Sequence, residues 1–160
     1  MAGVISRADH DRVVRFVAAT RFPFPGQADW PADNVTLTNE TERRRAIATP
    51  EGPHYPDIVV VSAAGEIREV AEVETAVGPE IARVWAWASA AADTRTRTGV
   101  RHFFVYVPAG LEAEARRLLE AGQISYAGLR AYEVDGARIR IRPVVTLGDP
   151  KDHVESLGTA

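Results

Sequence analysis

The continuous β-branched run Ile58-Val59-Val60-Val61 constrains the fold of this chain more than any other segment. Branched side chains favour extended backbone, and a short apolar run of this kind is typical of a strand. Ala63-Ala64-Gly65 then supplies a turn before the second apolar segment, Ile67–Thr75. This pattern predicts two antiparallel strands joined as a hairpin.

The segments before the hairpin predict one helix and a long loop. Residues Asp9–Arg21 carry an apolar stripe at helical spacing, and this segment ends before Pro23. Residues 22–56 are rich in proline and show no sustained period, so we expect a loop there. Within it, the pattern is consistent with an edge strand at Val35 and Leu37 or a short helix near Glu42.

The segments after the hairpin predict two helices, one strand and a second hairpin. The helices are expected at Val77–Thr96 and Leu111–Ala121, with the strand Val100–Val107 between them. Leu129–Val134 and Arg138–Val145 flank an Asp-Gly turn and form the second hairpin. A hairpin followed by a helix and a returning strand predicts an α/β domain with a mixed sheet and helices packed on it.

The size and composition of the chain are those of one folded domain. A chain of 160 residues with 46% hydrophobic and 26% charged residues is long enough to bury a single core. We expect that domain over residues 1–146 and a flexible tail over 147–160. The first residues contain no long apolar run, so neither an export signal nor a membrane span is expected, and the cytoplasm is the expected location.

Charge and residue usage exclude some kinds of site. The net charge of −3 argues against a protein that binds nucleic acid by overall charge alone, although a local basic face remains open. Lys151 is the only lysine among 19 Lys and Arg residues, so chemistry that needs a lysine in the core is unavailable. The four histidines are scattered and the chain has no cysteine, so a zinc site is not expected.

Three carboxylates are expected to meet at the first hairpin. Glu72 and Glu74 are two residues apart on a strand, so they point to the same face, separated by about 6.6–6.8 Å of rise. With Ala64 and Gly65 as the two turn residues, Asp57 lies directly opposite Glu72. Like charges in that position are destabilising. The cluster therefore needs a physical reason.

A divalent cation is one such reason. Close carboxylates raise one another's pKa or recruit a cation, and oxygen-only ligands suit Mg²⁺ or Mn²⁺. Such an ion polarises a phosphoryl oxygen and activates water, as phosphodiester hydrolysis requires. The alternative is structural: Glu72 and Glu74 lie at a solvated strand end and pair with nearby arginines.

The hairpin also resembles a known signature. Pro56-Asp57, about fifteen residues of hairpin, then Glu72-Val73-Glu74 and a helix resemble the restriction-endonuclease-like, or PD-(D/E)XK, nuclease superfamily. The resemblance covers roughly residues 54–107 and extends to small uncharacterised bacterial members. The resemblance implies a restriction-endonuclease-like fold, with a mixed β-sheet flanked by helices, and it implies that Asp57 and Glu72 are metal ligands. Glu74 stands where the superfamily usually has lysine, and it could act as a ligand or a base but cannot supply positive charge.

Two functions follow as expectations. The first is a Mg²⁺- or Mn²⁺-dependent nuclease that hydrolyses phosphodiester bonds of DNA or RNA, with Asp57, Glu72 and Glu74 as catalytic and metal-binding residues. The second is a non-catalytic nucleic-acid-binding or dimerisation module that keeps the nuclease fold.

Several other residues are weaker candidates for a functional role. The resemblance suggests a further upstream acid, for which Glu40 and Glu42 are available, and His54 could reach the acidic face. Two arginine groups could contact phosphates or simply be solvated: Arg43, Arg44 and Arg45, and Arg138, Arg140 and Arg142. Trp87 points away from the apolar stripe of its helix, so it is expected to be exposed or buried in a homodimer contact.

Overall fold

The structure is a computed structural model that describes residues 4–23, 25, 27, 30–95 and 98–147. Its helices are α1 (Arg7–Arg21), α2 (Pro79–Ala91) and α3 (Glu112–Ala121). Its strands are β1 (Val35–Thr38), β2 (Ile47–Thr49), β3 (Gly52–His54), β4 (Ile58–Val61), β5 (Ile67–Val73), β6 (Phe103–Pro108), β7 (Gly128–Asp135) and β8 (Arg138–Thr146).

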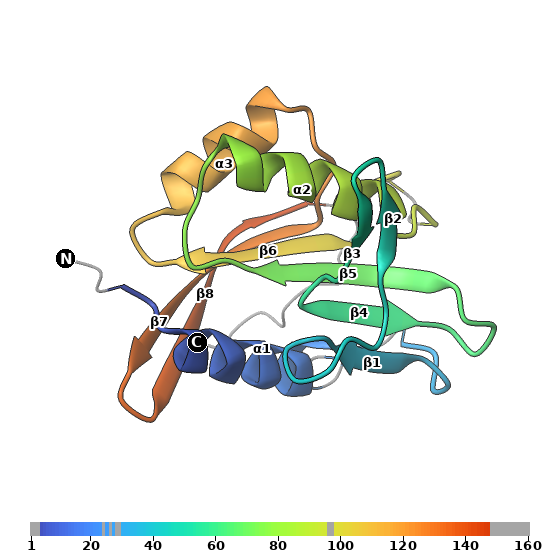
Figure 1. Ribbon diagram of the computed structural model, residues 1–160, viewed down its shortest axis with the longest axis horizontal. Coiled ribbons are helices and arrows are strands. Elements are labelled where there is room, and N and C mark those ends of the chain that lie inside the picture. Colours follow the sequence, from blue (N-terminus) through green and yellow to red (C-terminus); the bar gives the residue numbers. More distant parts are fainter. Residues whose placement is uncertain (1–3, 24, 26, 28–29, 96–97, 148–160) are drawn as a thin grey trace.

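A six-stranded mixed sheet forms the centre of the molecule. The strand order is β1-β4-β5-β6-β7-β8, in which β6 runs parallel to both β5 and β7 and the other neighbours are antiparallel. Helices α2 and α3 cover one face and α1 covers the other (Figure 1). The predicted α/β class, mixed sheet and two hairpins are therefore confirmed.

Each face of the sheet has its own apolar core. On the α2 and α3 side, the buried side chains include Val70, Val105 and Leu129 from the sheet and Trp85 from α2. On the α1 side, they include Ala71 and Val73 from β5, which pack with residues of α1. Because β5 alternates between two buried faces, its carboxyl end carries acids into an otherwise apolar interior.

The β4–β5 hairpin has the predicted register but not the predicted turn. Ile58 lies opposite Ala71 and Val59 opposite Val70, as expected. The turn contains three residues rather than two, since the Ser62 amide donates to the Glu66 carbonyl across residues 63–65. A β-bulge between Val60 and Val61 inserts one extra residue in β5, which restores the predicted register.

Local hydrogen bonds explain where the helices begin and end. Helix α1 begins two residues before its predicted start because the Ser6 hydroxyl caps it, accepting from the Asp9 amide at 3.0 Å. Helix α2 ends before its predicted end at Thr96. There the chain turns back to β5, where the Asp93 amide donates to the Arg68 carbonyl at 3.1 Å.

The predicted long loop contains more structure than expected. The edge strand at Val35 and Leu37 is present as β1, and residues 39–46 contain no helix, so a helix near Glu42 was the wrong alternative. The small β2–β3 hairpin was not predicted. Its Ile47 is 2% exposed and joins the core beneath α2, so this residue packs the hairpin against the domain.

Two remaining expectations concern Trp87 and the end of the chain. Trp87 is half-buried against the α2 side of the core, with the Arg83 guanidinium 5.6 Å from its ring centroid.

Leu147 continues the pairing of the sheet through its amide, which donates to the Ala127 carbonyl. The rest of the predicted tail, residues 148–160, lies outside the described residues. None of the described helices is long and apolar enough to cross a membrane.

Candidate functional site

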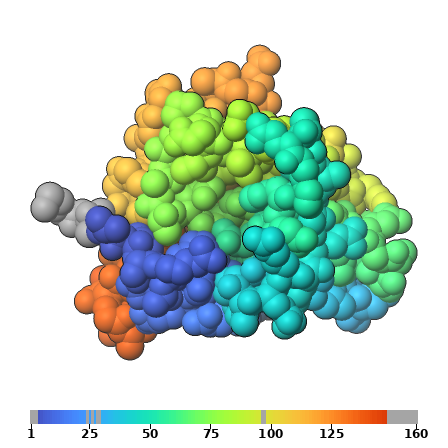
Figure 2. All heavy atoms as spheres, viewed as in Figure 1, coloured from blue at the N-terminus to red at the C-terminus, as the bar shows by residue number. Residues whose placement is uncertain are grey.

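The predicted carboxylates line a single open cavity of about 690 Å³. Asp57 directly precedes β4, Glu72 lies near the end of β5, and Glu74 follows that strand. Helix α1 contributes His10 to the same cavity, and the loop after β1 contributes Glu40 and Arg43. The surfaces of α1, α2 and the segment around residues 39–55 meet in this part of the molecule (Figure 2).

Glu72 is a buried carboxyl in an unfavourable electrostatic environment. The residue is 5% exposed, and its Oε1 lies 3.3 Å from Nε2 of His54. Burial raises the pKa of Glu72 well above its usual value, and the charge of Asp57 raises it further. The Asp57 backbone and the charge of His10 oppose this only in part. Burial and the charge of Asp57 therefore favour the neutral form of Glu72.

Glu74 is held in a defined orientation by two aromatic side chains. The Trp85 indole donates to Oε2 of Glu74 at 2.6 Å, and the Tyr132 hydroxyl donates to the Glu74 backbone carbonyl. Burial raises the pKa of Glu74 to about 8, with a further increase from the charge of Glu72, whereas the Trp85 bond lowers it. Glu74 is thus a preorganised proton-exchanging group close to neutral pH.

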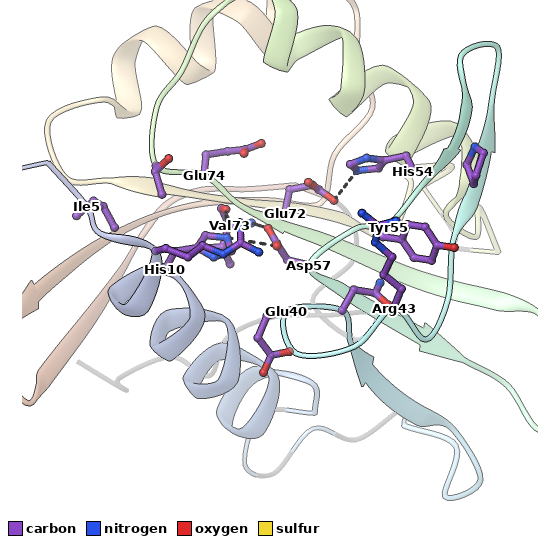
Figure 3. Close-up of a pocket in the computed structure, with 14 residues that line it drawn as sticks. Ile5, His10, Glu40, Arg43, His54, Tyr55, Asp57, Glu72, Val73 and Glu74 are labelled. Carbon is purple, nitrogen blue, oxygen red and sulfur yellow. Dashed lines mark hydrogen bonds and ion pairs between the residues drawn. The ribbon is translucent and has the colours of Figure 1, made fainter.

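Asp57 lies between the two faces of the site. Its Oδ2 accepts a hydrogen bond from the Val73 amide at 2.8 Å, and its Oδ1 lies 3.3 Å from Nε2 of His10. Figure 3 shows Glu72 and Glu74 on the α2 side of β5, whereas Asp57 turns toward His10 on α1. The three carboxylates were expected on one face, and Asp57 departs from that expectation because the Val73 amide and His10 hold its carboxylate on the α1 side.

His10 is the functional candidate that sequence reasoning missed. Its Nε2 lies 3.0 Å from the Val73 carbonyl and its Nδ1 lies 2.8 Å from Oδ1 of Asp11. The hydrogen bond with Asp57 raises the pKa of His10 to about 9, although burial opposes it. The sequence did contain one signal, because His10 falls on the same helical stripe as the buried Val14 and Val17.

Among the weaker candidates, Glu40 and His54 line the cavity and Glu42 does not. Glu40 lines the cavity with a side chain only 4% exposed, and Arg15 lies 3.6 Å from its Oε1. Glu42 is 70% exposed, pairs with Arg44 and does not line the cavity. His54 lines the cavity, and burial lowers its pKa while the charges of Asp57 and Glu74 oppose that change. Of the two upstream acids, only Glu40 is in a position to act.

Members of the two arginine groups line different cavities. Arg43 lines the carboxylate cavity, with its guanidinium 5.1 Å from the Tyr55 ring centroid. Arg140 and Arg142 instead line a second cavity of about 920 Å³ beside the start of α3. There, Arg142 pairs with Glu112 at 2.8 Å. Of the described residues in these two groups, Arg43 is the one that lines the carboxylate cavity, which Arg7 of α1 also lines.

The donor set limits how a metal could be bound. Within the described ranges, no group of three or more His, Cys, Asp or Glu side chains is arranged to hold a metal ion. Mg²⁺ usually keeps several waters and takes one or two protein carboxylates plus substrate phosphates. The acids that line the cavity, Asp57, Glu72, Glu74 and Glu40, present oxygen atoms, the ligand type that hard divalent cations prefer.

Comparison of the chain with protein-family models and with curated proteins finds no match. The functional assignment therefore rests on the geometry and chemistry of the site.

Proposed function

We propose that this protein is a Mg²⁺- or Mn²⁺-dependent nuclease that hydrolyses phosphodiester bonds of DNA or RNA at the Asp57, Glu72 and Glu74 site. The observation that carries this proposal is geometric: Glu72 is buried, Glu74 is half-buried, and both line one open cavity with Asp57. Burying two carboxyls beside a third is costly. A bound divalent cation would offset that cost.

The arrangement of elements supports the restriction-endonuclease-like fold that the resemblance implies. Asp57 precedes the first strand of a hairpin, and Glu72 and Glu74 follow at the end of the second. Helix α2 comes next, and β6 then returns parallel to β5. This order matches the Pro-Asp, hairpin, acid-x-residue and helix pattern on which the resemblance rests.

In this proposal, each residue of the site has a separate role. Asp57 and Glu72 would hold the ion, which would supply Lewis-acid stabilisation of the phosphoryl oxygens. Glu74 would accept a proton from the attacking water, because a carboxylate with a pKa near 8 is a stronger base than an ordinary glutamate. His10 would orient Asp57 through the contact at 3.3 Å and supply positive charge in a site without lysine.

One observation favours the alternative of a non-catalytic module. His10 already lies against both Asp57 Oδ1 and the Val73 carbonyl, so an internal cation partly balances the cluster without metal. In a degenerate nuclease, this pairing would preserve the fold after catalysis had been lost. The two functions differ in one measurable property, which is whether a divalent ion binds.

Saturating Mn²⁺ is expected to raise the melting temperature of the wild-type protein. A ligand at 100 times its dissociation constant stabilises the folded state by about 2.7 kcal/mol. Asp57→Ala and Glu72→Ala should abolish the increment, whereas Glu42→Gln should retain it because Glu42 lies outside the cavity. The measurement is differential scanning fluorimetry across millimolar Mn²⁺. An unchanged wild-type melting curve would favour the non-catalytic module.

The direct test of the nuclease proposal is cleavage. Wild-type protein is incubated with single-stranded and duplex DNA and RNA, with Mn²⁺ and separately with chelator. Metal-dependent strand cleavage that is lost in Asp57→Ala supports the proposal. Absence of cleavage on the whole panel, or cleavage that survives chelation, contradicts it.

A further inference from the structure

A second group of residues borders the carboxylates on the side where His54 lies. Tyr55 and Arg43 line the same cavity as Asp57, and the Arg43 guanidinium lies 5.1 Å from the centre of the Tyr55 ring. Figure 3 shows both side chains beside Glu72 and Asp57, Arg43 coming from the loop after β1 and Tyr55 from the segment before β4. Neither residue is used by the proposed chemistry.

The position of Arg43 is set by hydrogen bonds rather than by an acidic partner. The Asn39 side-chain amide donates to the carbonyls of Arg45 and Pro56 at 2.9 and 2.5 Å, so it ties the Arg43 loop to the segment that carries Tyr55. The Asn39 Oδ1 also accepts from the Arg44 and Arg45 amides at 2.7 and 3.0 Å. In the part of the chain that the structure describes, no carboxylate pairs with Arg43.

Arg43 is exposed, whereas Tyr55 is half-buried. The Arg43 guanidinium thus lies over the Tyr55 ring and remains accessible to a ligand from solvent. Planar guanidinium groups and aromatic rings are the surfaces on which proteins stack unpaired bases. Tyr55 is two residues from Asp57, a separation of at most about 7 Å along an extended chain. A base stacked on Arg43 would thus lie next to the proposed scissile phosphate.

We propose that Arg43, supported by Tyr55, forms a base-stacking subsite that selects single-stranded nucleic acid over duplex. This inference rests on the proposed function and names its substrate class. In a duplex, neighbouring base pairs cover both faces of every internal base, so such a base can stack on Arg43 only when it is unpaired. The cavity volume of about 690 Å³ also lies within the range of roughly 300–1,000 Å³ that holds one small ligand such as a nucleotide.

The chain offers a matched control for the charge of Arg43. Arg44 is the next residue, and its guanidinium pairs with Glu42 at 3.1 Å and does not line the cavity. Arg43→Ala and Arg44→Ala change the net charge equally, so a difference between them reports on position. Arg43→Lys keeps the positive charge but removes the planar guanidinium group. Tyr55→Phe keeps the aromatic ring, whereas Tyr55→Leu removes it.

The experiment is fluorescence anisotropy with labelled octanucleotides of DNA and of RNA, single-stranded and duplex, in chelator at one fixed salt concentration. Loss of stacking on one base corresponds to an affinity change of roughly 5- to 150-fold. We expect a change of that size for Arg43→Ala, Arg43→Lys and Tyr55→Leu on single strands, and less than about 2-fold for Arg44→Ala and Tyr55→Phe. Melting temperatures of the variants check that each one is folded.

Several outcomes would overturn the subsite. Equal losses in Arg43→Ala and Arg44→Ala would indicate general charge, and full rescue by Arg43→Lys would indicate a phosphate contact rather than stacking. Equal binding of single strands and duplexes by the wild type would also contradict the proposal. An octamer with one abasic position should bind more weakly than the intact strand, and equal binding of the two would argue against stacking.

Chelator separates this test from that of the nuclease. A wild type that prefers single strands through Arg43 but cleaves nothing would contradict the nuclease proposal alone. A wild type that cleaves with metal but shows no effect of Arg43→Ala would contradict the subsite alone. Comparison of the DNA and RNA arms then shows which sugar the site accepts.

Discussion

Glu74→Gln is expected to lower Mn²⁺-dependent cleavage by roughly 10²–10⁴, the range for a lost general base. Glutamine keeps the shape, and its amide oxygen can still accept the Trp85 indole bond, so the change removes mainly the charge and the basicity. Burial raises the pKa of Glu74 to about 8 in the metal-free site, and a bound cation would lower it. Wild-type activity should therefore increase with pH and level off below about pH 8. The measurement is the initial rate on the cleaved substrate from pH 6 to 9.

Two comparisons define what this experiment shows. Glu42→Gln should leave the rate and its pH dependence unchanged, because Glu42 is exposed and outside the cavity. Glu74→Lys restores the residue typical of the superfamily and removes one carboxyl from the cluster. Activity of Glu74→Lys in the absence of wild-type activity would identify a degenerate nuclease. Equal rates for wild type and Glu74→Gln would rule out the role assigned to Glu74.

Metal-free protein is expected to lose stability as the pH rises from 5 to 9. Between pH 4.5 and about 8, Glu74 keeps its proton in the folded state but loses it in the unfolded state. His10 behaves in the same way between pH 6.5 and about 9, as does the buried Glu69 up to about pH 8. The folded state therefore binds more protons than the unfolded state, and the free energy of unfolding falls as the pH increases.

The expected size of this effect is a substantial part of total stability. For Glu74 alone, a pKa of about 8 in place of 4.5 corresponds to roughly 5 kcal/mol. Domains of this kind have unfolding free energies of about 5–15 kcal/mol. The pKa of His54 is lowered in the folded state, so below about pH 6.5 His54 makes the free energy of unfolding increase with pH. Its effect should be confined to the acid end of the range.

Urea unfolding in chelator at pH 5, 7 and 9 measures this dependence. Glu74→Gln should flatten the decline between pH 5 and 8 and should be more stable than wild type at pH 8, since a neutral amide has no proton to lose. Glu42→Gln should keep the wild-type slope. A free energy of unfolding that stays constant or increases with pH would show that the buried acids are not held in their neutral form.

Much of the fold was predictable because its signals are local. The β-branched run at Ile58–Val61, the apolar stripe of α1 and the Asp-Gly turn before β8 each specify an element within a few residues. Strand alternation placed Glu72 and Glu74 on one face, and Asp57 lines the same cavity but turns toward His10. The register of this hairpin was predicted correctly although its turn length was not. The turn has three residues rather than two, and the β-bulge between Val60 and Val61 compensates for the extra one.

Contacts between segments far apart in the sequence have no comparable local signal. The sequence by itself determined the mixed α/β class, the hairpin and the shared face of Glu72 and Glu74, because periodicity and turn residues act over short distances. Only the tertiary structure decided that His10 meets Asp57, that Trp85 orients Glu74 and that Arg43 rests on Tyr55. Each of these contacts depends on how a helix or loop packs against the sheet. That packing depends on the shape of the whole core rather than on the pattern of any one segment.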